Sequence, residues 1–149
     1  MSSFDQIIAD SPEIIFTEGD NFVWSPEINT IYYPKNDRTC MSLLHEIGHA
    51  KLAHKSYQLD IQLVKMEADA WQIASELAPK YDIDIPTEHV ENCMDTYRDW
   101  LLSRARCPEC EIAGIQSAVS LLYTCINCAK KWKVPMETQC IVRRRVVEA

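Results

Sequence analysis

Apolar residues recur at helical spacing in two proline-free segments, residues 39–55 and 60–78. In the first segment they project to both sides, which is typical of a helix that runs through a core. In the second they form one stripe opposite a polar face, and Pro79 ends the pattern. The stripe consists of Leu63, Val64, Trp71, Ala74 and Ala78, and the polar face of Lys65, Asp69, Gln72 and Glu76. Because the connection between the segments is short, we expect the two helices to pack antiparallel.

The rest of the pattern predicts a sheet before these helices and another helix after them. Short β-branched and aromatic runs at 13–16, 22–24 and 30–33 are separated by turn-forming residues, which predicts a small antiparallel sheet. A further helical pattern runs from residue 87 to about 105 and is bounded by prolines. The chain is therefore expected to be an α+β protein in which a small antiparallel sheet packs on the helices.

The first helix carries two histidines four residues apart, His45 and His49, with Glu46 directly after the first. Residues four apart lie one turn above each other, so both imidazoles can bind one metal ion. Glu46 projects roughly 100° further round the helix, where a carboxylate can take a proton from a zinc-bound water. This HExxH spacing predicts a zinc hydrolase site, provided that a third ligand exists. Gly48 lowers helix stability unless another segment packs closely against it.

Glu67 is the best candidate for the third ligand. It lies in the middle of the apolar stripe, where a carboxylate needs a cation or several donors to stay charged. Antiparallel packing would bring it back towards the histidines; the alternative is a side chain that reaches out to water. His54 projects roughly opposite the histidine pair, so a role at the C-terminal end of the helix suits it better. Asp60, on the same stripe as Glu67, is a weaker rival.

These two segments resemble the ImmA/IrrE-like metallopeptidases, cytoplasmic gluzincin-like proteins of bacteria and their mobile elements. The family's HExGH helix is matched by residues 45–49, and its second motif, E-A-(N/D)-x-(aromatic)-A, by residues 67–71. The resemblance covers roughly residues 14–80. It implies one catalytic zinc ion on His45, His49 and Glu67, with Glu46 as general base. It also implies a protein substrate such as a transcriptional repressor or another regulatory protein.

The family resemblance also implies how a substrate would bind. In zincins the edge of a sheet beside the metal binds the peptide as an added strand, and residues 30–33 could be that edge. The chain departs from the family at three positions. Lys65 stands where a further Glu is common, Trp71 replaces the usual Phe, and Gln72 replaces an alanine. These departures leave the subfamily and the substrate open.

Two CxxC pairs near the C-terminus form a second metal-binding pattern, Cys107 with Cys110 and Cys125 with Cys128. Their separation suits a four-cysteine zinc ribbon in which residues 112–123 form a hairpin. Four thiolates complete a tetrahedral site, so this zinc would be structural. Disulfides are the alternative, but the seven cysteines are an odd number, and the sequence shows no signal peptide or transmembrane run. We therefore expect a cytoplasmic protein with one catalytic and one structural Zn²⁺.

The length allows one small catalytic domain and a small ribbon. We predict a metallopeptidase domain at 1–86, a connecting helix at 87–106 and the ribbon at 107–149. The net charge is −7, yet residues 107–149 contain six basic and four acidic residues. The basic residues, interleaved with Trp132, are Lys130, Lys131, Lys133, Arg143, Arg144 and Arg145. They could contact nucleic acid or an acidic protein surface, or form a solvated strand face.

Two other functions fit parts of this sequence. SprT-like proteases also combine an HExxH motif with a C-terminal zinc ribbon, and they act on proteins attached to DNA. Their third ligand is a histidine, however, and no His lies between His54 and His89. The other alternative is a non-catalytic regulatory or DNA-binding protein that zinc only stabilises. Such a protein would have no use for Glu46.

Overall fold

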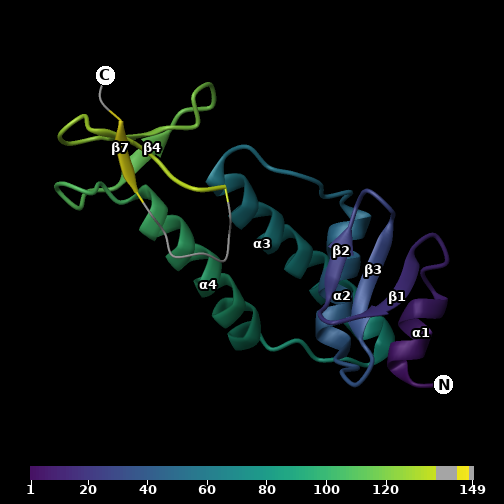
Figure 1. Ribbon diagram of the computed structural model, residues 1–149. Helices are drawn as coiled ribbons and strands as arrows, with labels where there is room; N and C mark the ends of the chain where they lie inside the picture. Colours follow the sequence, from purple (N-terminus) through teal and green to yellow (C-terminus); the bar gives the residue numbers. More distant parts are fainter. Residues whose placement is uncertain (137–143, 148–149) are drawn as a thin grey trace. The chain divides into compact units, whose positions relative to one another are not determined.

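The computed structural model describes residues 1–136 and 144–147 of the chain. Its helices are α1 (Ser3–Ala9), α2 (Cys40–Lys51), α3 (Asp60–Leu77) and α4 (Thr87–Ala105), with a 3-10 helix η1 (Ala78–Tyr81). Its strands are β1 (Ile15–Gly19), β2 (Val23–Ser25), β3 (Thr30–Pro34), β4 (Gly114–Gln116), β5 (Tyr123–Cys125), β6 (Lys131–Lys133) and β7 (Arg145–Val147) (Figure 1). The predicted α+β class is confirmed.

The chain divides into two compact units, each considered by itself. The N-terminal unit comprises residues 1–56 and 65–91, and the C-terminal unit comprises residues 57–64 and 92–149. The domain limits predicted after residues 86 and 106 stay predictions. Among the described residues, no helix is both long and apolar enough to span a membrane.

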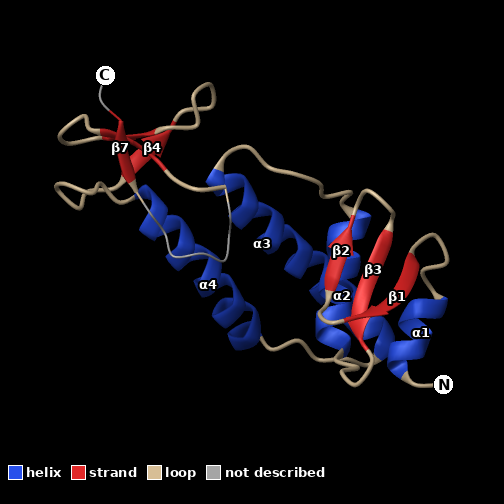
Figure 2. Cartoon of the chain, in the orientation of Figure 1, coloured by secondary structure: helices blue, strands red, loops and turns tan. Residues whose placement is uncertain are grey.

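The N-terminal unit contains a three-stranded sheet of order β1-β3-β2 that packs on α2 (Figure 2). Strand β3 pairs parallel with β1 and antiparallel with β2. The sheet is therefore mixed, whereas the sequence predicted an antiparallel one. The prediction that residues 30–33 form an edge is wrong, because β3 is the central strand. The consecutive buried residues Thr30 and Ile31 fit a central position, and β2 is an edge.

Helix α2 begins after Thr39, whose backbone N–H donates to Asp37 Oδ1 at 3.0 Å. The helix ends at Lys51, before the predicted end at Lys55, because Ala53 adopts a left-handed conformation with a φ of 53°. Its buried residues are Leu43, Leu44, His45, Ile47, Gly48 and His49. The helix therefore runs through a core, as its two-sided apolar pattern predicted.

Helices α2 and α3 approach each other closely at Gly48. A Cβ atom at this position would lie 2.4 Å from the carbonyl oxygen of Ala70 and 3.0 Å from its carbonyl carbon and Cα. These are backbone atoms of α3, so only glycine allows this approach. The contact places the part of α3 that carries Glu67 against the histidine helix.

Helix α1 was not predicted from the sequence. Its N-cap is Ser2, whose hydroxyl oxygen accepts from the backbone N–H of Asp5 at 3.2 Å. The helix buries Phe4 and Ile7 in the N-terminal unit. Its seven residues make only two turns, which is too short for an apolar period to stand out.

The C-terminal unit contains an antiparallel sheet of order β4-β5-β6-β7. Strands β4 and β5 form the hairpin that the sequence predicted between the two CxxC pairs. The buried cluster on this sheet consists of Ala105, Cys107, Tyr123, Cys125 and Trp132. Trp132 stacks on Tyr123 with 5.6 Å between ring centroids, and its indole N–H donates to the carbonyl of Arg104 at 2.8 Å.

A buried ion pair also holds the C-terminal unit together. Arg104 donates from Nε to Asp60 Oδ2 at 2.8 Å and from Nη2 to Asp60 Oδ1 at 3.1 Å. Tyr123 donates its hydroxyl proton to Asp60 Oδ2 at 2.6 Å. Asp60, considered above as a weaker rival to Glu67, is therefore fully engaged in this network, and the structure does not bring it into a metal-binding group.

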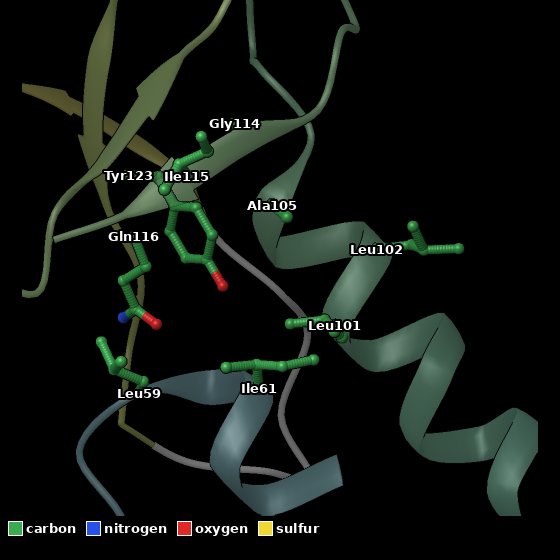
Figure 3. Close-up of a pocket in the computed structure, with 9 residues that line it drawn as sticks. All are labelled: Leu59, Ile61, Leu101, Leu102, Ala105, Gly114, Ile115, Gln116 and Tyr123. Carbon is green, nitrogen blue, oxygen red and sulfur yellow. The ribbon is translucent and has the colours of Figure 1, made fainter. Parts of the chain in front are cut away.

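An apolar hollow of about 430 Å³ lies in the C-terminal unit between α3, α4 and the β4–β5 hairpin (Figure 3). Its walls are Leu59, Ile61, Leu101, Leu102, Ala105, Gly114, Ile115, Gln116 and Tyr123. The side chain of Gln116 accepts from the backbone N–H of Asp60 and donates to the carbonyl of Leu121. Since the Tyr123 hydroxyl is also engaged, the hollow offers mainly apolar contacts.

Candidate metal centres

The first candidate centre lies between α2 and α3 in the N-terminal unit and consists of His45, His49 and Glu67. The two Nε2 atoms are 3.1 Å apart; Glu67 Oε2 lies 2.9 Å from His45 Nε2, and Glu67 Oε1 lies 3.3 Å from His49 Nε2. Zinc bonds of about 2.0–2.1 Å in a tetrahedron place neighbouring donor atoms about 3.3 Å apart. The three side chains therefore fit one small metal ion.

The burial of these side chains supports the same conclusion. All three residues are less than 10% exposed, and their lone-pair-bearing atoms face one another. Such an arrangement requires a proton or a cation between the atoms. Burial raises the pKa of Glu67, but hydrogen bonds from His45 and His49 outweigh it and lower the pKa to about 2. Burial lowers the pKa of His49, and Glu67 reverses this to raise it above 6.5. The carboxylate is thus charged at neutral pH, as a metal ligand must be.

Glu46 lies beside this group and outside it. Its Oε2 accepts from the backbone N–H of Trp24, on edge strand β2, at 2.8 Å, which orients the carboxylate. Burial raises the pKa of Glu46, and the charges of His45 and His49 oppose the rise. A half-buried carboxylate with a raised pKa has the properties of a general base.

Each of the two histidines contacts a further aromatic ring. Trp71, in the middle of the α3 stripe, stacks on His45 with 4.2 Å between centroids and an interplanar angle of 26°. His54 lies beyond the end of α2, and its Nδ1 is 2.8 Å from His49 Nδ1. Sequence analysis missed the bond from Trp24 to Glu46 and the ring contact of His54, because each depends on the tertiary path of a strand or a loop.

The second candidate centre is the group of Cys107, Cys110, Cys125 and Cys128 in the C-terminal unit. Their closest sulfur pairs are 3.4, 3.6 and 3.8 Å apart. These separations are far longer than a disulfide bond of about 2.05 Å, and close to the roughly 3.8 Å between sulfurs in a tetrahedral zinc site with 2.3 Å bonds. The four cysteines predicted as ligands therefore lie together and are not joined by disulfide bonds.

Hydrogen bonds shift the thiol pKa values of this cluster in both directions. The backbone N–H of Lys130 lowers the pKa of Cys128, but burial and the neighbouring thiols outweigh it and raise that pKa to about 12. The backbone N–H of Ile112 and the side-chain amide of Asn127 are the main causes that lower the pKa of Cys110 to about 6. The residue after each CxxC pair, Glu111 or Ala129, has a positive φ of 64° or 62°. Glycine is common at such turns, so the two positions are strained for their side chains.

The basic residues of the C-terminal unit do not form one stripe. Trp132 is fully buried, whereas Lys131 and Lys133 lie on the opposite, exposed face of β6. Lys133 pairs directly with Arg145 across the ladder, so both side chains lie on that face. Lys130 forms an ion pair with Glu109 at 3.4 Å, and Arg144 donates to the carbonyl of Arg106. Arg143 lies outside the described residues.

Comparison with protein-family models, curated proteins and solved structures finds no match for this chain. The geometry and chemistry of the two centres are therefore the basis for a functional assignment.

Proposed function

We propose that the protein is a zinc-dependent metallopeptidase with its catalytic centre at His45, His49 and Glu67. One observation carries this proposal: three buried donors converge at zinc-binding distances, and a separate carboxylate, Glu46, lies beside them. A purely structural site would need no such carboxylate. The carboxylate ligand on α3 also supports the resemblance to ImmA/IrrE-like peptidases over SprT-like ones, whose third ligand is a histidine.

Zinc in this centre would polarise a scissile carbonyl and lower the pKa of water towards neutrality. Glu46 would take the proton of the attacking water and then donate it to the departing amine. The hydrogen bond from Trp24 would orient this carboxylate for both transfers. Since Trp24 belongs to edge strand β2, an extended peptide could lie along this strand and bring its carbonyl near Glu46, although the N–H of Trp24 is already used by Glu46 and would not pair with the peptide.

The C-terminal centre would hold a structural zinc ion in a ribbon, because four sulfurs leave no open position. The exposed cations Lys131, Lys133 and Arg145 would contact an anionic partner, nucleic acid or an acidic protein surface. Because Trp132 is buried, any contact with nucleic acid would be through phosphates rather than by base stacking. We place the protein in the cytoplasm, acting on a regulatory protein.

The substitution Glu46→Gln tests the catalytic proposal, with Glu76→Gln on the exposed face of α3 as the matched control. Zinc content is measured by elemental analysis, and cleavage of a peptide library by mass spectrometry. We expect one zinc ion per centre in all three proteins, and a loss of cleavage by about 10²–10⁴-fold in Glu46→Gln alone. Equal cleavage by Glu46→Gln would overturn the proposed role. Zinc binding without any cleavage by the wild type would favour the non-catalytic alternative.

A second experiment addresses the anionic partner. Binding of duplex and single-stranded DNA would be measured at increasing salt for the wild type and for a Lys131→Glu/Lys133→Glu variant. Loss of each phosphate contact should reduce the salt dependence by about one unit of slope. Binding that is unchanged in the variant would exclude this face as the contact surface.

A further inference from the structure

We infer that His54 is a positioning residue for the metal ligand His49: it accepts a hydrogen bond from His49 Nδ1 and thereby fixes the tautomer and ring orientation of that ligand. The inference rests on the proposed metal centre. It starts from the 2.8 Å distance between the two Nδ1 atoms, with ring centroids 5.1 Å apart and an interplanar angle of 63°.

The roles of the four ring nitrogens follow from one requirement. His49 Nε2 faces His45 Nε2 and Glu67, so Nε2 is the atom that would bind zinc through its lone pair. A neutral imidazole with a free lone pair on Nε2 carries its proton on Nδ1. That proton can only be donated to His54 Nδ1 if His54 offers a lone pair there. His54 must therefore be neutral, with its own proton on Nε2.

His54 is held in this position by its backbone. Its N–H donates to the carbonyl of His49 at 3.0 Å, in the turn that the left-handed Ala53 creates at the end of α2. Its carbonyl accepts from the indole N–H of Trp24 at 2.9 Å. These two backbone hydrogen bonds fix the turn that carries His54 and so place its ring next to His49.

Trp24 extends this arrangement to the other side of the centre. Its backbone N–H holds Glu46, while its indole holds the turn that carries His54. One residue of edge strand β2 thus supports both the base and the partner of a ligand. Metal ligands are commonly oriented by carboxylates or carbonyls, and loss of such a partner reduces metal affinity about 10–100-fold.

Zinc affinity of the full chain distinguishes a positioning role from a general packing role. His54→Phe retains an aromatic ring without an acceptor, whereas His54→Asn retains an oxygen near the place of Nδ1. The exposed neighbour Lys55→Ala serves as control. A competition titration with a chelating indicator gives two zinc-binding steps, and Glu67→Ala identifies the step that belongs to the histidine centre. We expect His54→Phe to weaken that step by about 10–100-fold, and His54→Asn and Lys55→Ala to stay within a few-fold of wild type.

A second readout reports the tautomers directly. Two-bond ¹H–¹⁵N spectra of histidine-labelled, zinc-loaded protein should show the proton on Nδ1 of His49 and on Nε2 of His54. The inference is overturned if His54→Phe binds zinc as the wild type does, if His54→Asn is no better than His54→Phe, or if His49 carries its proton on Nε2. Failure of the wild type to bind zinc in the histidine centre would instead overturn the proposed function.

Discussion

The close approach of α2 and α3 leads to a quantitative prediction for Gly48→Ala. Alanine in the middle of a helix is normally more stable than glycine by about 1 kcal/mol. Here the new Cβ would lie 2.4 Å from the carbonyl oxygen of Ala70, an atom that cannot rotate away. The helices must then separate locally, and overpacking of this kind typically costs 1–3 kcal/mol. Subtracting the helix gain from this cost, we expect a net loss of up to about 2 kcal/mol in the free energy of unfolding.

The same separation would also disturb the metal centre, because Glu67 reaches the histidines only from a closely packed α3. Zinc affinity of this centre should therefore decrease together with stability. Urea unfolding followed by circular dichroism, with zinc and with chelator, measures the stability, and competition titration measures the zinc affinity. Lys51→Ala, on the exposed surface of the same helix, is the control.

A second substitution makes the test specific. The clash involves backbone atoms of residue 70, so Ala70→Gly should not restore stability or zinc affinity to Gly48→Ala. If Gly48→Ala is instead more stable than the wild type by about 1 kcal/mol and binds zinc equally well, the intrinsic helix preference is the only effect present. The helices would then not approach as described.

Three further predictions concern charge and metal. In chelated protein, the stabilisation lost in Glu67→Gln should be complete above about pH 4.5 and vanish as the pH falls towards 2, since the folded pKa of Glu67 is depressed. His49 also stabilises the folded state, but its contribution has the opposite pH dependence: it is complete below pH 6.5 and is lost as the pH rises through the raised pKa of His49. Urea unfolding should therefore show the largest difference between the wild type and Glu67→Gln near pH 5–6. Arg104→Met should destabilise the protein by about 3–5 kcal/mol by leaving Asp60 buried without its partner, and adding Asp60→Leu should recover much of this loss, as a double-mutant cycle of unfolding energies would measure. Cys107→Ser should lower the zinc content by one ion per chain and leave the histidine centre loaded; a variant that retains both ions by elemental analysis would contradict the four-cysteine centre.

Local periodicity was enough to predict most of the first centre. His45 and His49 lie one turn apart on a single helix, so their convergence needs no knowledge of the fold. Glu67 could be assigned because a carboxylate in an apolar stripe is unusual. The cysteine centre was equally accessible, since each CxxC pair brings its own two ligands together within one turn.

The features that sequence analysis missed depend on non-local geometry. Alternating strands do not reveal which strand is central, so β3 was misplaced at an edge. His54 was judged from a helix that was assumed to continue, but Ala53 turns the chain and redirects the ring towards His49. Likewise, Trp132 was grouped with its basic neighbours along the sequence, although strand alternation buries it.

The buried cluster of the C-terminal unit has a consequence for the abundance of this protein in a cell. Two of its five members, Cys107 and Cys125, are also candidate metal ligands, so the apolar core and the candidate metal centre share residues. A chain made during zinc shortage would leave Trp132 and Tyr123 without a complete core, and such chains are targets for degradation. If the cysteine centre holds zinc as proposed, the abundance of the protein should then follow zinc availability.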